Sequence, residues 1–426
     1  MNHPDNFKKF DIRKFDINNI DVEAFLEVAK KGIKKPNIFV CGATGTGKSS
    51  LILDIFNYDL KDAPEIGAGA PVTRGVHKYE NNDLSVVLHD SEGYEIGSEQ
   101  EKHYYSDIIG YVDEYKGNGE YDTIHEVWYC VSAGNKRFTD ADADIIRELQ
   151  KRRLPVCVII TKIDQAFRKE LDQLIEAIKE EFGNIGIFTY ASLPGLHQTA
   201  ARQNLTKAGL IQREEMISWA IESLDVRLRY GFLTSINGAL KQKHDFVLKQ
   251  IPMWGAGALA AVVGNSFVPV PFTDAAFLKG IQVVMALYIM QAYNISGAGP
   301  KVVGSVVGAS IISDLGRSLA NSLAKYLPVI GQGVSVANAT VAASITATLG
   351  LTLNEICFRY LKTYVNDSGE VTVPFADFFT MKLFTETLNN IKENSGDLIK
   401  SITDAIKEKV EADKDKEITI DWGDKK

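Results

Sequence analysis

The chain has 426 residues, too many for one ordinary hydrophobic core, and this length predicts two or three domains. Hydrophobic residues make up 45% of it and charged residues 24%, a composition typical of folded globular proteins rather than of disordered ones. The net charge of −8 argues against a nucleic-acid coat or a broadly polybasic membrane binder, so we expect no nucleic-acid partner.

Residues 1–35 are predicted to form an amino-terminal helical extension, with a helix over Asp21–Ile33 whose apolar side chains recur on one face. The first 15 residues hold no apolar run of the kind found in secretory signals. The 4 cysteines form no CxxC pair and are interpreted as reduced core thiols. These features predict a cytoplasmic protein.

Short apolar runs alternate with helical patterns between residues 36 and 224. This alternation predicts an α/β domain with a mostly parallel sheet that helices cover on both faces. The predicted strands are Pro36–Val40, Val76–Tyr79, Leu84–His89, Glu126–Ser132, Val156–Thr161 and Ile187–Ala191. The predicted helices are Lys48–Phe56, Ser98–Tyr115, Thr139–Lys151, Ala166–Glu180 and Gln212–Leu224.

A glycine-rich turn after the first strand carries a phosphate-binding pattern, GATGTGKS, which fits GxxxxGK(S/T) at every fixed position. Its glycines let backbone N–H groups approach phosphate oxygens, and the following helix points its positive end at the same oxygens. Lys48 is expected to reach the β- and γ-phosphates, and the Ser49 hydroxyl to bind Mg²⁺. The expected nucleotide-binding residues here are Gly42, Ala43, Thr44, Gly45, Thr46, Gly47, Lys48, Ser49 and Ser50.

A second motif, TKID at the end of the strand Val156–Thr161, fits the (N/T)KxD pattern and predicts the base. The Asp164 carboxylate can accept hydrogen bonds from the guanine N1–H and amine, whereas adenine has no N1–H at that edge. The stem of Lys162 can cover the base plane. Thr161, Lys162 and Asp164 therefore indicate a guanine nucleotide and disfavour an ATPase or kinase.

The remaining expected positions lie in three loops. The sequence DSEG at Asp90–Gly93 fits DxxG, in which the aspartate holds Mg²⁺ through water and the glycine N–H contacts the γ-phosphate. Thr73 is expected to close over Mg²⁺, and the loop at Ala191 and Ser192 to contact the guanine oxygen. The predicted catalytic residues are Lys48, Thr73 and Gly93, and the predicted metal ligands are Ser49, Thr73 and Asp90.

The ordered motifs resemble those of the translation-factor-related GTPases, near the Era-like and TrmE-like group, and also those of immunity-related GTPases. The similarity covers about residues 36–224, and the run Asn135–Asp140 before the next helix adds to it. The resemblance implies a P-loop GTPase domain that hydrolyses GTP to GDP and phosphate with Mg²⁺. Turnover would be slow without a partner or a GTP-dependent dimer.

Two positions depart from related patterns. Tyr94 follows DxxG, where Ras-like enzymes have a glutamine that orients the attacking water. Another group must then position water: Arg74, Glu92, a partner, or a second copy of the chain. Gly45 stands where potassium-activated TrmE-like enzymes carry asparagine, which puts potassium stimulation in doubt.

Beyond residue 225 the strand patterns stop and the composition becomes apolar and rich in small residues. Leu228–Ile251 is predicted as one long helix, and helices are predicted at Pro374–Glu393 and Ser395–Glu411. The predicted segments are an apolar Gly/Ala-rich helical domain over residues 225–365, carboxy-terminal helices over 366–412, and a charged tail over 413–426.

The segment Phe267–Asp274, FVPVPFTD, and the helices around it resemble the helical domain of unknown function in YcjF-like bacterial GTPases, over about residues 250–365. That resemblance implies membrane association, here with the inner membrane. Tyr326–Asn354 is long enough to cross a hydrocarbon core, which needs about 20 residues, but it contains Pro328 and Gln332. A helical bundle, reversible membrane docking and insertion all remain open.

Two hypotheses of function follow from these features. In the first, the protein is a GTP-hydrolysing switch whose helical domain contacts a membrane or a partner protein according to nucleotide state. In the second, GTP drives self-assembly into a mechanical or scaffolding protein on membranes. Turnover per molecule that rises with protein concentration would distinguish the second from the first.

Overall fold

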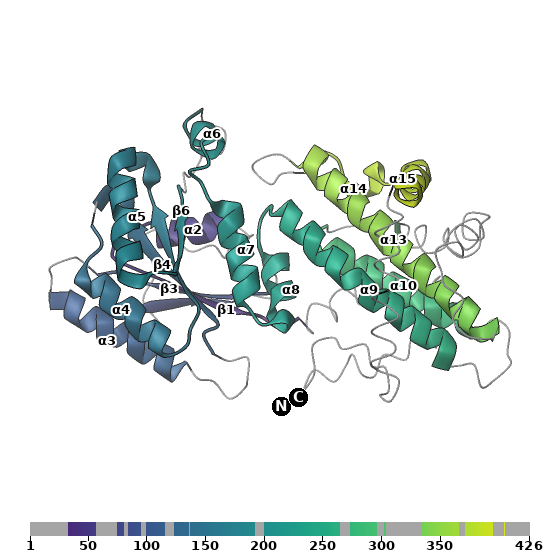
Figure 1. Ribbon diagram of the computed structural model, residues 1–426, viewed down its shortest axis with the longest axis horizontal. Helices are drawn as coiled ribbons and strands as arrows, with labels where there is room; N and C mark the ends of the chain where they lie inside the picture. Colours follow the sequence, from purple (N-terminus) through teal and green to yellow (C-terminus); the bar gives the residue numbers. More distant parts are fainter. Residues whose placement is uncertain are drawn as a thin grey trace. The chain divides into compact units, whose positions relative to one another are not determined.

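The structure is a computed structural model that describes residues 33–56, 75–80, 84–94, 99–115, 123–135, 137–191, 200–264, 273–295, 302–303, 334–365, 371–394 and 404. These residues fall into two compact units, one at Ile33–Ala239 and one that begins at Leu240 (Figure 1). Some predictions lie wholly or mostly outside the described residues: the helix up to Gly32, Thr73 with Arg74, Ser192, most of Phe267–Asp274, the helix at Ser395–Glu411 apart from residue 404, and the tail over 413–426.

The first unit is built on a six-stranded sheet in the order β2-β3-β1-β4-β5-β6. Neighbouring strands are parallel except β2, which is antiparallel to β3. The strands are β1 (Asn37–Cys41), β2 (Val76–Tyr79), β3 (Val87–Ser91), β4 (Glu126–Ser132), β5 (Val156–Thr161) and β6 (Gly186–Thr189). The four central strands are buried at every residue, as a sheet covered on both faces requires. The predicted mostly parallel sheet is confirmed.

Helices cover the two faces of the sheet (Figure 1). On one face, α3, α4 and α5 pack against side chains such as Phe39, Tyr129 and Val158. On the other face, Trp128 stacks on Phe56 after α2 and meets Phe232 of α8 edge to face. The helices are α2 (Lys48–Ile55), α3 (Glu99–Glu114), α4 (Asp140–Lys151), α5 (Arg168–Phe182), α6 (Ala200–Lys207), α7 (Arg213–Ser223) and α8 (Val226–Ser235).

The prediction of one long helix over Leu228–Ile251 is wrong. Helix α8 ends at Ser235, and a new helix, α9 (Leu240–Gly264), starts after a turn. Gly238 and Ala239 have φ values of 58° and 51°, in the left-handed region that a right-handed helix cannot contain. The chain turns there because Ile236 pairs with Phe56 in an antiparallel bridge, which holds α8 within the first unit.

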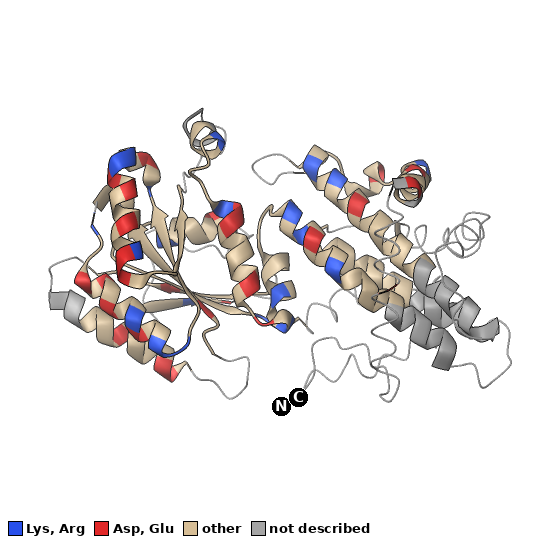
Figure 2. Ribbon diagram, viewed as in Figure 1, with Lys and Arg blue, Asp and Glu red and all other residues tan. Residues whose placement is uncertain are grey.

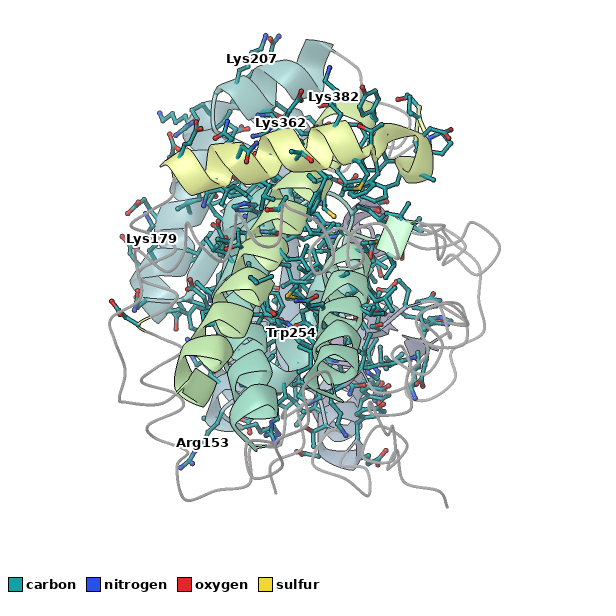
Figure 3. The ribbon with its side chains drawn as sticks, turned by 90° about the vertical axis from the view of Figure 1, so that its right-hand side faces the viewer. Arg153, Lys179, Lys207, Trp254, Lys362 and Lys382 are labelled. Carbon is teal, nitrogen blue, oxygen red and sulfur yellow. The ribbon has the colours of Figure 1, made fainter. Side chains whose placement is uncertain are left out.

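The second unit is helical, as predicted, with α9, α10 (Thr273–Ala292), α13 (Val334–Tyr364), α14 (Phe375–Phe378) and α15 (Met381–Asn394). The three long helices lie side by side, and α15 crosses α13 (Figures 1 and 3). Pro374–Glu393 is therefore two helices instead of the single one predicted. The break precedes Leu383, whose N–H donates to the Thr380 hydroxyl at 3.1 Å as an end cap.

Aromatic and polar contacts lie inside this helical unit among apolar side chains. Trp254 is buried among the long helices, 5.6 Å from the ring of Tyr288 (Figure 3). The Gln282 amide donates to the Thr346 hydroxyl at 3.2 Å, and both side chains are buried. Within the described ranges, no helix is long and apolar enough to span a membrane.

Candidate functional site

The loop between β1 and α2 has the strained backbone that its glycines allow. Gly42, Gly45 and Gly47 have φ values of 139°, 71° and 88°, which L side chains rarely adopt. Gly42 also lies against β4, where an added Cβ would stand 2.2 Å from the carbonyl oxygen of Cys130. The loop ends at the first turn of α2, whose N–H groups have no partners within the helix. This local geometry lies where the sequence predicts an anion cradle.

Lys48 places its ammonium over this loop. Its side-chain nitrogen donates to the carbonyl oxygens of Gly42 at 3.0 Å and of Ala43 at 3.1 Å. Burial lowers the pKa of Lys48, and the charge of Asp90 opposes that shift. The side-chain nitrogen therefore lies at the loop where the motif predicts contact with phosphate oxygens.

Asp90 and Ser49 meet beside the loop. The Ser49 hydroxyl donates to Asp90 Oδ2 at 2.7 Å, although the two residues are 41 positions apart. Asp90 is 4% exposed, and within the described residues its Oδ1 has no hydrogen-bond partner. Burial raises the pKa of Asp90, and Lys48 counteracts it. A buried carboxylate oxygen without a partner beside a hydroxyl is a donor set for a hard cation, so these residues fit Mg²⁺.

The guanine motif lies against the same loop. The Thr161 hydroxyl donates to the carbonyl oxygen of Thr46. Lys162 has a φ of 53°, and its Cε lies 3.8 Å from where a Cβ on Gly47 would stand. Asp164 follows on the exposed side, where a ligand can reach its carboxylate. The structure thus brings the phosphate motif and the base motif together.

The last strand supplies a third side of the site. Beyond β6, Tyr190 accepts a hydrogen bond from the Ile163 N–H at 3.4 Å and donates its own N–H to Ile160 at 2.8 Å. These contacts hold the buried Ala191 next to TKID. The Tyr190 hydroxyl also donates to Asp54 of α2. Ala191 is therefore placed beside the base motif, as predicted.

The DxxG segment packs directly on the phosphate loop. A Cβ added to Gly93 would lie 2.3 Å from the backbone nitrogen of Thr44, so only glycine allows this approach. The Thr44 N–H donates to the carbonyl oxygen of Tyr94 at 2.9 Å. The Tyr94 ring is buried, and its hydroxyl donates to Asp142 Oδ1 at 2.9 Å. Tyr94 therefore faces the core and does not replace a water-orienting glutamine.

Tyr104 is a residue of this site that sequence reasoning missed. It comes from α3, is buried, and brings its hydroxyl to the first glycine of the loop. The hydroxyl accepts from the Gly42 N–H at 2.8 Å, lies 3.2 Å from the Gly42 carbonyl oxygen and lies 2.9 Å from the Ser91 hydroxyl. No motif marks this tyrosine, because only its place on the inner face of α3 brings it here.

Comparison with models of known protein families finds none that matches the chain. Among curated proteins, human septin-14 is 26% identical over 193 residues, which are 41% of this chain and 44% of septin-14. The probable GTP-binding protein EngB of Wolbachia is 27% identical over 151 residues, 35% of this chain and 73% of that protein. The EngB of Methanococcus aeolicus is 24% identical over 180 residues, 38% and 75% of the two chains. The chain thus spans less than half the length of septin-14.

The first unit has the fold of a P-loop GTPase domain. Solved structures with some likeness include Era from Aquifex aeolicus, with GDP and aluminium fluoride, at 15% identity and a TM-score of 0.31 over 52% of this chain and 67% of that one. Another is the elongation factor SelB from Methanococcus maripaludis, at 15% identity and a TM-score of 0.25. The match covers 42% of this chain and 34% of that one. At these scores the likeness adds nothing to what the strand order of the GTPase domain shows.

Proposed function

We propose that this protein binds GTP in its GTPase domain and hydrolyses it to GDP and phosphate. The observation that carries the proposal is that one loop contacts both the DxxG segment and the TKID motif. It meets DxxG through Thr44 and Tyr94, TKID through Thr46 and Thr161, and Asp90 through Ser49, at the start of α2. The two EngB relatives, described as probable GTP-binding proteins, support the same nucleotide.

Each motif then has a defined role. Backbone N–H groups of the loop other than those of Gly42 and Thr44, which are bonded within the protein, hold the β- and γ-phosphates together with the ammonium of Lys48. Ser49, Asp90 and Thr73 would hold Mg²⁺, and the bound ion would supply positive charge that neutralises the phosphate oxygens. Asp164 accepts hydrogen bonds from the guanine edge, and the Ala191–Ser192 loop contacts the guanine oxygen. The γ-phosphate contact of Gly93 completes the set.

Titration calorimetry tests this proposal on the full chain with Mg²⁺. Heat of binding is expected for GTP and GDP and none for ATP, because adenine leaves Asp164 without a donor. The variant Lys48→Ala should lose the heat for GTP, while Lys151→Ala, at an exposed lysine on α4, should keep it. Absence of heat for both guanine nucleotides with the wild-type chain would rule the proposal out.

We further propose that the helical unit from Leu240 onward, which the structure separates from α8 at the start of the predicted segment 225–365, relays the nucleotide state to a membrane or a partner protein together with the segment 366–412. The support is the resemblance of Phe267–Asp274 to the YcjF-like helical domain, together with the resemblance of the GTPase domain to the Era-like and TrmE-like group. Most of that segment lies outside the described residues.

A further inference from the structure

Two titratable side chains near Asp90 are not fixed positions of the recognised motifs. In the ladder between β2 and β3, His77 lies directly opposite Asp90. Residues paired in this way project from the same face of a sheet, and so do residues two apart on one strand. Glu92 is two residues beyond Asp90, and its N–H donates to Gly75 at 2.7 Å, which continues the ladder. His77, Asp90 and Glu92 therefore share the face on which Asp90 meets Ser49.

His77 and Glu92 are also in contact. His77 Nε2 lies 3.5 Å from Glu92 Oε1. The histidine is largely enclosed, with 17% of its side chain exposed, and its ring stacks on Tyr79 with centroids 6.3 Å apart. The Glu92 side chain is 49% exposed, so a water molecule can reach it. Its other oxygen lies 3.5 Å from where a Cβ on Gly75 would stand, so the carboxylate covers the start of β2.

The place of Glu92 in the chain matters for hydrolysis. It directly precedes Gly93, which packs on the phosphate loop and is the proposed γ-phosphate contact. Hydrolysis requires a water molecule held in line with the γ-phosphate, a task that a glutamine after DxxG performs in Ras-like enzymes. Tyr94 occupies that position and is bonded to Asp142 in the core. An acceptor for the water must therefore come from another residue.

We propose that Glu92 orients the attacking water and that His77 holds Glu92 in place. This inference rests on the proposed GTP hydrolysis. The water oxygen forms a bond to the γ-phosphorus, and the bond from that phosphorus to the β–γ bridging oxygen breaks with its electron pair leaving on GDP. The water proton passes to a γ-phosphate oxygen, so phosphate departs as dihydrogen phosphate. Glu92 accepts a hydrogen bond from the water and keeps no proton, and His77 is a positioning residue.

Single-turnover hydrolysis of GTP by the full chain tests Glu92. Glu92→Ala should lower the rate by about 10- to 100-fold, the scale on which loss of orientation acts. Glu92→Gln should restore most of the rate, because the amide oxygen also accepts a hydrogen bond. Both variants should bind GDP with wild-type affinity. Glu80→Ala removes another half-exposed glutamate with a basic neighbour, and it should be unchanged.

The role of His77 is tested by non-additivity. His77→Ala should slow single-turnover hydrolysis in the wild-type background but have no further effect when Glu92 is already alanine, since the two act as a unit. His77→Gln, which can still donate to the carboxylate, should be milder. His103→Ala, at an exposed histidine on α3, should leave the rate unchanged.

The outcomes separate this inference from the proposed function. Wild-type hydrolysis with an unaffected Glu92→Ala variant would overturn the water-positioning role and leave GTP hydrolysis standing. Equal slowing by Glu92→Gln and Glu92→Ala, or a shared loss of GDP affinity, would show a structural role and would also overturn it. A wild-type chain that hydrolyses no GTP at any protein concentration would overturn both.

Discussion

At the scale of single residues, the Tyr104 hydroxyl joins the phosphate loop to the DxxG segment. The hydroxyl accepts a hydrogen bond from the Gly42 N–H and lies 2.9 Å from the Ser91 hydroxyl, and both Tyr104 and Ser91 are buried. The Gly42 carbonyl oxygen is at the same time an acceptor for Lys48. One phenol therefore affects the position of the lysine that is proposed to hold the phosphates.

The variant Tyr104→Phe is expected to lower the free energy of unfolding by about 1–3 kcal/mol, because it leaves the buried Gly42 N–H without a partner. It should also weaken GDP binding, since the loop loses a support. Urea unfolding and fluorescent-GDP titration measure the two effects. Tyr105→Phe removes a hydroxyl from the neighbouring side chain, which is 38% exposed, and should change neither quantity. Equal effects of the two variants would contradict this role of Tyr104.

The base preference belongs to Asp164. The variant Asp164→Asn should bind GTP about 100-fold or more weakly, because two hydrogen bonds to a charged acceptor are lost. It should gain affinity for xanthosine triphosphate, whose base offers an acceptor to the new amide. Competition titration with both nucleotides measures the change. Asp172→Asn, at an exposed aspartate on α5, is the matched control, and unaltered GTP binding by Asp164→Asn would refute the base assignment.

At the scale of elements, β3 and α3 are joined by a buried polar cluster around His89. Its Nδ1 lies 2.7 Å from the Tyr111 hydroxyl and its Nε2 lies 2.9 Å from Asn37 Oδ1. Burial, with a contribution from the charge of Lys78, lowers the pKa of His89 to about 3. The imidazole is therefore neutral in the folded protein at pH values where an unfolded chain would be protonated.

This shift predicts a pH dependence of stability. Between the ordinary histidine pKa of about 6.5 and about 3, the unfolded state binds the proton and the folded state does not. The contribution of His89 to the free energy of unfolding is complete above about pH 6.5. It decreases as the pH falls, and the loss is about 3 kcal/mol near pH 4.5. Urea unfolding at several pH values measures the free energy of unfolding, and its change with pH should be smaller for His89→Gln than for wild type. His103→Gln should keep the wild-type slope, and identical slopes for all three would refute the prediction.

The elements also show what the sequence could and could not predict. Loop motifs with fixed spacing, such as GATGTGKS and TKID, specify local backbone and chemistry, and the structure places them around one site. The break at Gly238 was missed because it depends on Ile236 pairing with Phe56, 180 positions earlier in the chain. Tyr104 and the contact of His77 with Glu92 depend on packing and strand register, which a single sequence does not reveal.

At the scale of the whole molecule, a GTPase domain is followed by a helical unit of different composition. Figure 2 shows acidic and basic residues interspersed along α4 and α5, on the described surface of the GTPase domain. In the second unit, charged residues gather at the start of α9 and toward the end of α13 (Figure 2). The apolar unit is the part that the proposed function assigns to a membrane or partner.

Flotation with liposomes tests that assignment. The full chain should float with vesicles to a greater extent in the presence of a non-hydrolysable GTP analogue than in the presence of GDP. The nucleotide-dependent difference should disappear in Lys48→Ala, which is expected to bind neither nucleotide. A chain that stays at the bottom of the gradient in every state would contradict membrane coupling.

Hydrolysis per molecule that increases with protein concentration would indicate assembly rather than a simple switch.

Asp142 links several segments of the GTPase domain through hydrogen bonds to its side chain. Its carboxylate accepts hydrogen bonds from the Tyr94 and Tyr129 hydroxyls. It also accepts one from the N–H of Thr139, the residue that caps α4. The residue after DxxG, β4 and the start of α4 therefore depend on a single acidic group. A rearrangement of the residues after DxxG would therefore also displace the first turn of α4, because Tyr94 and Thr139 bind the two oxygens of the same carboxylate.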